Sequence, residues 1–321
     1  NLIVARCVET AAMNSTIGDN APAAAGVDVY NATHYDTITP ANDVLFIAKY
    51  PGSLGNSLKV QVIDSNAWAD ATVNEDFIAN FDTTPGTSAD VLAANGGSGT
   101  YNDEMHILVI DEDGLWTGTP GYVLEKHAYV SKASDAKRID GSSNYVGTVL
   151  RNESAYIWLG PAANLTSSSA ASGSEASAGS SMAGTVFKQI DGTGKEIVGG
   201  SLVQAADGNA CTDTELEAAY GLFTNPEVVD VSLVMAAGGS NVTGKWIIDH
   251  VSDARKDCVT FVSPVKGSVV QASGQMASLV TDSTALGSSS YAVMDSAWKY
   301  QYDRYNDVFR YVPMNGDMAG L

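Results

Sequence analysis

The chain has 321 residues, of which 45% are hydrophobic and 17% are charged, so it is long enough to bury the cores of two or three domains. Lys and Arg number 17 against 37 Asp and Glu, and the formal charge of -20 argues against a nucleic acid as partner. The sequence contains no apolar run long enough to span a membrane, so we expect no membrane insertion of this chain.

The N-terminal part reads as one strand followed by an irregular segment. Residues 1–9, "NLIVARCVE", form an apolar run that is typical of a strand, and we expect it to join a sheet formed much later in the chain. Residues 10–43 are rich in Ala, Asn and Thr and are expected to be loops. Because the chain opens without Met and directly in a strand-like run, we interpret it as a fragment or a processed chain.

Residues 44–160 have the pattern of a small β domain. Short runs with strand-like composition are separated by turn residues at hairpin-like spacing. The runs are "VLFIAKY", "SLKVQVID", "EMHILVIDEDG", "GYVLEKHAYVS" and "SAYIWLG". We predict a mainly antiparallel domain here, either a barrel or a sandwich.

The turn between the first two of these runs is unusually rich in special residues: Tyr50, Pro51, Gly52, Gly55 and Asn56. Proline fixes φ, both glycines can adopt a positive φ, and Asn56 can hydrogen-bond to the turn backbone. We therefore predict a turn that leads the chain tightly back into the β domain.

The next segment, residues 161–184, is a low-complexity stretch of Ser, Ala and Gly and is predicted to be a linker or a long surface loop.

From residue 185 the pattern becomes that of an α/β domain. Thr212 and Glu215 form a capping box, and a helical apolar stripe follows it. The run 228–237, a helix capped by Asn241, and the run 257–263 predict a βαβ unit with parallel strands. The stripe expected on the capped helix comprises Val242, Trp246, Ile247, His250, Val251 and Ala254. We expect a multidomain α+β or α/β protein in which residues 1–43 and 185–321 form one discontinuous domain and residues 44–160 are inserted in it.

The sequence motifs of common enzymes and cofactor sites are absent. The Gly-rich segment before Ser240 is not a dinucleotide-binding motif, and Gln189 stands where a phosphate-binding loop requires Gly. Asp249 and His250 lack a nucleophile elbow, and His250 is interpreted as a packing residue. We therefore predict no catalysis and no cofactor.

The spacing of the histidines, acidic residues and cysteines in the sequence does not indicate a metal site or a disulfide. His34, His106 and His127 are scattered along the chain, and "DEDG" at 111–114 is interpreted as a solvated hairpin turn rather than a Ca²⁺ loop. Cysteine occurs three times, at a spacing that fits no metal or redox motif, so buried free thiols are expected at Cys7, Cys211 and Cys258.

Several segments resemble tail sheath proteins of contractile-tailed bacteriophages. "AKYPGSLGNSLKVQV" is similar to that family's segment A(K/R)-(F/Y)-PG-x-x-GN-x-(I/L)-x-V. "NLIVARCVE" and the aromatic-rich "YAVMDSAWKYQYDRYND" resemble further family segments. The ending "YVPMNGDMAGL" is similar to VPPSGxxAGxxAR at Pro313, Gly316, Ala319 and Gly320, although Met314 and Asn315 replace Pro and Ser.

This resemblance implies a structural subunit that forms hexameric rings stacked helically around an inner tube, and whose contraction drives the tube through the host envelope. It implies an outward-facing inserted β domain and an apparently absent C-terminal part. The implied partners are other copies of the sheath protein, the tail tube protein, the baseplate and the tail terminator. The implied location is the virion tail sheath, assembled in the host cytoplasm. The alternative class is a secreted or surface-layer acidic binding module without catalytic activity.

Overall fold

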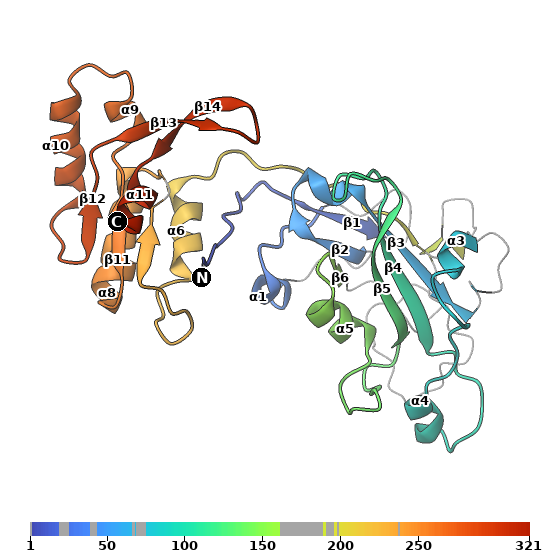
Figure 1. The fold of residues 1–321 in the computed structure, drawn as a ribbon. Coiled ribbons are helices and arrows are strands. Elements are labelled where there is room, and N and C mark those ends of the chain that lie inside the picture. Colours follow the sequence, from blue (N-terminus) through green and yellow to red (C-terminus); the bar gives the residue numbers. More distant parts are fainter. Residues whose placement is uncertain are drawn as a thin grey trace. The chain divides into compact units, whose positions relative to one another are not determined.

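The computed structural model describes residues 2–18, 26–38, 44–65, 68, 75–160, 189–190, 196–197, 199–236 and 238–321 (Figure 1). The chain divides into two compact units. The β unit is Thr10–Asn209, and the α/β unit combines Asn1–Glu9 with Ala210–Leu321. The chain therefore leaves the α/β unit after Glu9 and returns to it at Ala210.

The β unit contains two larger antiparallel sheets. One has the order β1 (Asn14–Gly18), β2 (Val44–Pro51), β6 (Ile157–Leu159). The other has the order β5 (Tyr122–Ser131), β4 (Glu104–Asp111), β3 (Leu58–Asp64), β9 (Gly199–Ser201). The antiparallel prediction is confirmed, and no sheet closes into a barrel within the described ranges. A separate short pair joins β7 (Gln189–Ile190) and β8 (Glu196–Ile197).

One hydrophobic core lies between the two larger sheets. It joins Phe46 of β2 to Val60 of β3 and to Val109 of β4, the cross-strand neighbour of Val60, each 0% exposed. The other face of β4 is also covered, because His106 stacks on Phe81 with ring centroids 4.1 Å apart. Burial on both faces explains why β4 reads as a nearly continuous apolar run.

Short helices complete the β unit: α1 (Ala32–Tyr35), η1 (Ser53–Ser57), α3 (Glu75–Ile78), α4 (Ala89–Ala94) and α5 (Val146–Glu153). Strand β1 and helix α1 lie in the segment that was predicted to be loops only, and that prediction is wrong there. The predicted linker at 161–184 lies outside the described residues.

The compact units differ from the predicted domain limits for residues 10–43 and 185–209. The physical reason is strand pairing, since β1 pairs with β2 and β9 pairs with β3. The insertion of a domain with the limits 44–160 between residues 1–43 and 185–321 remains a prediction.

The α/β unit is built on a parallel sheet with the order β10 (Leu233–Met235), β11 (Val259–Val262), β12 (Ala292–Met294). The chain passes from β10 to β11 through α7 (Asn241–Ile247), η2 (Ile248–Ser252) and α8 (Asp253–Arg255), so the predicted βαβ unit is confirmed. The remaining elements are α6 (Asp213–Gly221), α9 (Lys266–Val269), α10 (Gln275–Leu286), β13 (Trp298–Asp303), β14 (Val308–Pro313) and α11 (Asn315–Gly320).

The helix predicted to follow Thr212 forms as α6, with the capping box that the sequence indicated. The backbone N–H of Thr212 donates to Oε2 of Glu215 over 2.6 Å. Helix α7 forms too, although its N-cap is Ser240 rather than Asn241.

Two strand predictions for the α/β unit need correction. Residues 2–9 belong to this unit but form no strand, so the sheet begins at β10. Strand β10 is much shorter than the predicted run 228–237, and only one face of it is buried, since Leu233 is 50% exposed.

The buried face of α7 and η2 also differs from the prediction. Gly244, Ile247, Ile248 and Val251 are buried, at spacings of three and four that form one helix face. His250 lies outside this face and is exposed, and its packing is the stacking of its ring on Trp246, so the prediction that it belongs to the apolar stripe is wrong.

Candidate functional site

The turn between β2 and β3 carries the first group of predicted site residues. Pro51 ends β2, and Gly52 has φ 119° and ψ 166°, a region that is essentially restricted to glycine. Tyr50 packs edge-on against Trp116, with ring centroids 5.6 Å apart. The prediction that Gly52 takes a positive φ is confirmed.

Gly55 and Asn56 serve this turn differently from what was predicted. Gly55 does not have a positive φ; a Cβ at this position would collide with Oγ of Ser15 in β1. Asn56 bonds to a distant segment, because its Oδ1 accepts from N–H of Ala205 over 2.9 Å and its Nδ2 donates to O of Ala205 over 3.3 Å. Both residues therefore hold other parts of the chain against the turn.

The same turn gathers the incoming and outgoing chain of the β unit. Asp207 accepts from N–H of Ser53 over 2.8 Å and from its hydroxyl over 2.6 Å. Incoming Met13 and outgoing Ala206 form a bridge, in which N–H of Met13 donates to O of Ala206 over 2.9 Å. We call this meeting of residues 13–16, 50–57 and 203–207 the junction.

The second group of predicted site residues lies at the other end of the chain, in β14 and α11. Pro313 pairs with Trp298 across the β13–β14 hairpin. Gly316 approaches Met235 of β10, whose Sδ would be 3.6 Å from a Cβ at this position. Ala319 and Gly320 are in the last turn of α11, and Gly320 is exposed with open space beside it. This group therefore forms a short helix beside the sheet.

An aromatic face on the β13–β14 hairpin is the most distinctive surface of the α/β unit. Residues directly opposite one another in an antiparallel pair point to the same side. The register therefore places on one side Trp298, Tyr300, Tyr302, Phe309, Tyr311 and Pro313, which we call the aromatic face. Tyr300 is 60% exposed and Phe309 55%, and their rings stack with centroids 5.2 Å apart.

The base of the aromatic face is anchored, whereas the ribbon of the hairpin tip projects from the rest of the α/β unit (Figure 1). Trp298 donates from Nε1 to O of Pro264 over 2.8 Å, and Nζ of Lys266 lies 5.6 Å from the ring of Tyr311. Tyr305 at the tip is 86% exposed. The anchored base holds an exposed row of rings in one orientation.

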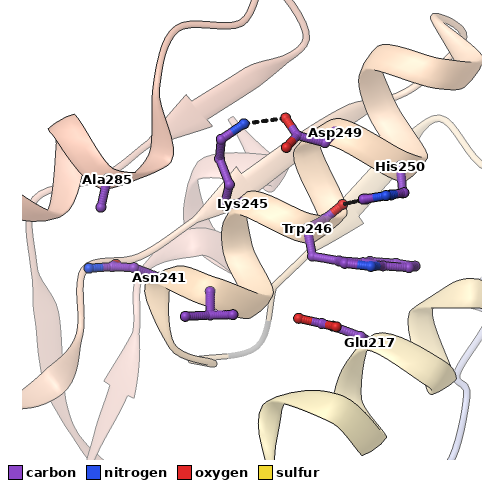
Figure 2. Close-up of a pocket in the computed structure, with 8 residues that line it drawn as sticks. Glu217, Asn241, Lys245, Trp246, Asp249, His250 and Ala285 are labelled. Atoms are coloured by element: carbon purple, nitrogen blue, oxygen red, sulfur yellow. Dashed lines mark hydrogen bonds and ion pairs between the residues drawn. The ribbon is translucent and has the colours of Figure 1, made fainter.

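A shallow depression of about 370 Å³ lies along α7 (Figure 2). Within it Lys245 forms an ion pair with Asp249, and Nδ1 of His250 bonds to O of Trp246 at 3.0 Å. The rings of Trp246 and His250 stack with centroids 4.6 Å apart. These internal contacts leave no free nucleophile–base pair among the residues drawn in Figure 2.

Asp111, in the predicted "DEDG" turn, accepts hydrogen bonds from neighbouring protein groups. Its carboxylate accepts from the hydroxyl of Ser57 over 2.7 Å and from the N–H groups of Thr117 and Trp116 over 2.8 and 3.0 Å. Within the described ranges no three His, Cys, Asp or Glu side chains are grouped to hold a metal, and no helix has the length and apolarity needed to cross a membrane.

Comparison with known proteins points to one class, the structural proteins of phage tails. No family model matches the chain. It is 27% identical over 294 residues to the tail sheath protein of Enterobacteria phage T4, covering 86% of this chain and 39% of that protein. It is 27% identical over 400 residues to the tail sheath protein of Salmonella phage ViI, covering 99% of this chain and 57% of that protein.

A third relative, the tail sheath protein of Vibrio phage KVP40, is 36% identical over 140 residues, covering 36% of this chain and 20% of that protein. The resemblance to tail sheath proteins is thereby confirmed. The chain spans from a fifth to little more than half of the length of these relatives.

Proposed function

We propose that this chain is part of a structural subunit of a contractile phage tail sheath. In this proposal the subunit polymerises helically around the inner tail tube, and contraction of the polymer drives the tube through the host envelope. The observation that carries the proposal is the similarity to a tail sheath protein over 99% of this chain. The role is structural and needs no bound cofactor.

The proposed partners are other copies of the sheath protein, the tail tube protein, the baseplate and the tail terminator. The proposed location is the tail of the virion, after assembly in the host cytoplasm. The β unit, as the domain inserted in the α/β unit, is proposed to face outward from the sheath.

The aromatic face supports contact with a second copy. Exposed clusters of large aromatic side chains are typical of protein interfaces. Charge favours another copy as the partner, since the chain carries -20 whereas the hairpin is locally basic. Residues 298–313 combine two acidic residues with three basic ones: Lys299, Arg304 and Arg310.

Electron microscopy tests the proposal. The chain is expressed in the context of its complete reading frame, and the purified protein is imaged in negative stain. A sheath subunit is expected to form long hollow tubes, or to decorate the tail along its whole length when antibodies against residues 1–321 are applied to virions. Dispersed particles together with unlabelled tails would contradict the proposal and favour the secreted binding module.

A further inference from the structure

His106 of β4 is fully buried, and both nitrogens of its ring are hydrogen-bonded. Its exposed fraction is 0%. The backbone N–H of Tyr129 in β5 donates to Nδ1 over 3.1 Å, and Nε2 lies 3.0 Å from O of Thr83. Because a backbone N–H can only donate and a carbonyl oxygen can only accept, Nδ1 is the acceptor and Nε2 carries the proton. The two bonds therefore fix the ring as one neutral tautomer.

The ring is enclosed by aromatic and apolar groups. It stacks on Phe81 with centroids 4.1 Å apart, and the rings of Tyr129 and Trp68 meet it edge-on at 4.5 and 6.0 Å. Its cross-strand neighbour in β3 is Ile63. Burial in these surroundings lowers the pKa of the imidazole, and the bond to the loop carbonyl opposes this effect only in part. A positive charge on the ring is therefore unfavourable while the site stays closed.

The bond from Tyr129 holds an unusual stretch of β5. Tyr129 has φ 54°, in the left-handed region that bulky residues rarely adopt. The register of β4 and β5 shifts around His106, as at a β-bulge. The side-chain amide of Asn144 donates to O of Tyr129 over 2.9 Å, and the Tyr129 hydroxyl bonds to Oγ1 of Thr83 at 2.6 Å. The imidazole therefore connects this irregular part of β5 to the loop at residues 81–86.

We propose that His106 is an acid-sensitive latch between β5 at Tyr129 and the loop at residues 81–86. A proton taken from solvent occupies the lone pair of Nδ1, so this nitrogen can no longer accept and two N–H groups point at each other. The bond from Nε2 to O of Thr83 survives, because Nε2 keeps its proton. Hydration of the charged ring then requires Phe81 and its loop to move aside, and Tyr129 loses a bond that keeps it in the left-handed conformation.

The opening is confined to one side of β4. Successive residues of a strand face opposite sides, so Ile107 and Val109 lie on the other side from His106. Both are 0% exposed and belong to the core between the two larger sheets. The backbone pairing of β4 with β3 runs through the whole of Leu58–Asp64 and does not involve the imidazole. The amide of Val109 therefore serves as an internal reference for global unfolding.

Other titratable groups lie around the ring, and one of them also responds to acid. The strand register and the loop place there Glu104 of β4, Lys126 and Tyr129 of β5, and Asp82 of the loop. Asp82 and Lys126 are exposed. Glu104 accepts from N–H of Gly86 over 3.1 Å, and burial raises the pKa of its carboxyl group above 4.5. The test must therefore separate Glu104 from the imidazole.

The direction of the pH dependence follows from the lowered pKa of His106. In the open state the imidazole has the ordinary pKa of 6.5, whereas in the closed state the pKa lies below this value. Above pH 6.5 the ring is neutral in both states and the latch is closed. As the pH falls below 6.5, the equilibrium shifts toward the open state by about tenfold per pH unit, until the pKa of the closed state is reached.

Histidine NMR and hydrogen exchange on the 321-residue chain test the proposal. At about pH 7.5 the ¹⁵N spectrum is expected to show a neutral His106 with its proton on Nε2. Between about pH 7 and pH 5, the protection factor of the Tyr129 N–H is expected to fall by about tenfold or more, after correction for intrinsic exchange. The amide of Phe81 is expected to follow, whereas the protection of Val109 should change by less than about threefold.

Two single replacements separate the groups. In His106→Asn, Oδ1 can accept from the Tyr129 N–H at every pH, so the acid-dependent fall in protection should shrink to less than about twofold. Glu104→Gln is the matched control, because its amide oxygen can still accept from Gly86, and the fall should stay within about twofold of that in the unchanged chain.

Three results would overturn the proposal. One is a proton on Nδ1 of His106 at neutral pH. Another is protection of the Tyr129 N–H that does not fall with decreasing pH. The third is a fall that persists in His106→Asn or disappears in Glu104→Gln. If His106→Asn does not fold, the unchanged chain decides, because the charging of His106 and the exposure of the Tyr129 N–H must then share one midpoint within about half a pH unit.

Discussion

Gly52 holds a backbone conformation that other residues avoid, and its surroundings leave no room for a side chain. A Cβ there would lie 2.7 Å from Oδ1 of Asp207. At φ 119° and ψ 166° the conformational cost alone is about 1–3 kcal/mol for a residue other than glycine. We expect Gly52→Ala to lower the free energy of unfolding of the β unit by at least about 2 kcal/mol, measured in urea melts.

Gly86 is the matched control for this substitution. It lies in the same unit, its φ is not positive, and nothing lies within 4 Å of an added Cβ. Gly86→Ala should change the free energy of unfolding by less than about 0.5 kcal/mol. Equal effects at both positions would show that the turn tolerates a side chain and that its glycine is not required.

Asp111 gives the β unit a defined acid sensitivity. Burial raises the pKa of its carboxyl group, but the hydrogen bonds from Ser57, Thr117 and Trp116 outweigh burial and hold the pKa below the ordinary value of 3.8. Because the folded-state pKa is lowered, the stabilisation is present above pH 3.8 and is lost as the pH falls through the folded-state pKa.

We therefore expect Asp111→Asn to reduce the free energy of unfolding at neutral pH by about 1–3 kcal/mol, because the amide cannot accept all the donors. The difference from the unchanged protein should shrink as the pH falls below 3.8. Asp113→Asn, at an exposed neighbouring position, should have little effect at either pH. A difference for Asp111→Asn that does not depend on pH would refute the role of the carboxylate charge.

Ile247 and His250 test which face of α7 and η2 is buried. Ile247 is 0% exposed in the core of the α/β unit, so Ile247→Ala should lower the free energy of unfolding by about 2–4 kcal/mol. His250 is exposed and stacks only on the half-buried Trp246, so His250→Ala should cost less than about 1 kcal/mol. Guanidinium melts of both variants provide the measurement. A larger loss of unfolding free energy for His250→Ala than for Ile247→Ala would contradict the assignment of the buried face.

At the scale of single residues, the sequence reveals local geometry but not distant partners. The positive φ of Gly52 could be predicted because Pro51-Gly52 is a turn signal in itself. The need for glycine at position 55 and for asparagine at position 56 could not be predicted. It arises from contacts with Ser15 and Ala205, which are distant in the sequence. No local pattern encodes a contact of that kind.

Elements with a clear start signal or a regular alternation were predictable. The capping box at Thr212 marked the start of α6, and alternating residues marked β3. The apolar runs at 1–9 and 228–237 were misread, because hydrophobic content alone does not show whether backbone hydrogen bonds find a strand partner. The aromatic face could have been found, since Trp298, Tyr300 and Tyr302 alternate in the sequence.

The aromatic face leads to a prediction for assembly that rests on the proposed function. In the complete protein, the double variant Tyr300→Thr and Phe309→Thr keeps strand-forming residues but removes the two stacked rings. We expect the concentration needed for tube formation to rise by at least about tenfold, as for interface hot spots worth 1.4 kcal/mol or more. Sedimentation velocity with negative-stain imaging provides the measurement.

The opposite side of the same hairpin supplies the control. Gln301 and Arg310 face each other there, and replacing both with Thr leaves every ring in place. This variant should assemble at a concentration within about threefold of the unchanged protein, since rim residues contribute little to affinity. Equal loss in both variants would mean that the hairpin matters through its fold and not through its aromatic face.

At the scale of the whole molecule, the α/β unit is discontinuous in the sequence: Asn1–Glu9 and Ala210–Leu321 are separated by the β unit, Thr10–Asn209. In the β unit, the backbone N–H of Met13 donates to O of Ala206 over 2.9 Å, so the two ends of that unit are joined. Met13 and Ala206 are each four residues from a crossing, so a short linker can join Glu9 to Ala210 when the β unit is removed. This adjacency predicts that each unit can fold without the other.

The test removes residues 10–209 and joins Glu9 to Ala210 through about six Gly and Ser residues, whose mean end-to-end reach is roughly 14 Å. The shortened protein should unfold cooperatively, because the core around Val234, Ile247 and Val262 lies entirely in the retained residues. Residues 10–209 alone should also fold, since the junction pairs both of its ends. Far-UV circular dichroism and denaturant melts provide the measurements. If either piece lacks a cooperative transition, its core depends on the other unit, and the division at Glu9 and Ala210 does not mark independently stable parts.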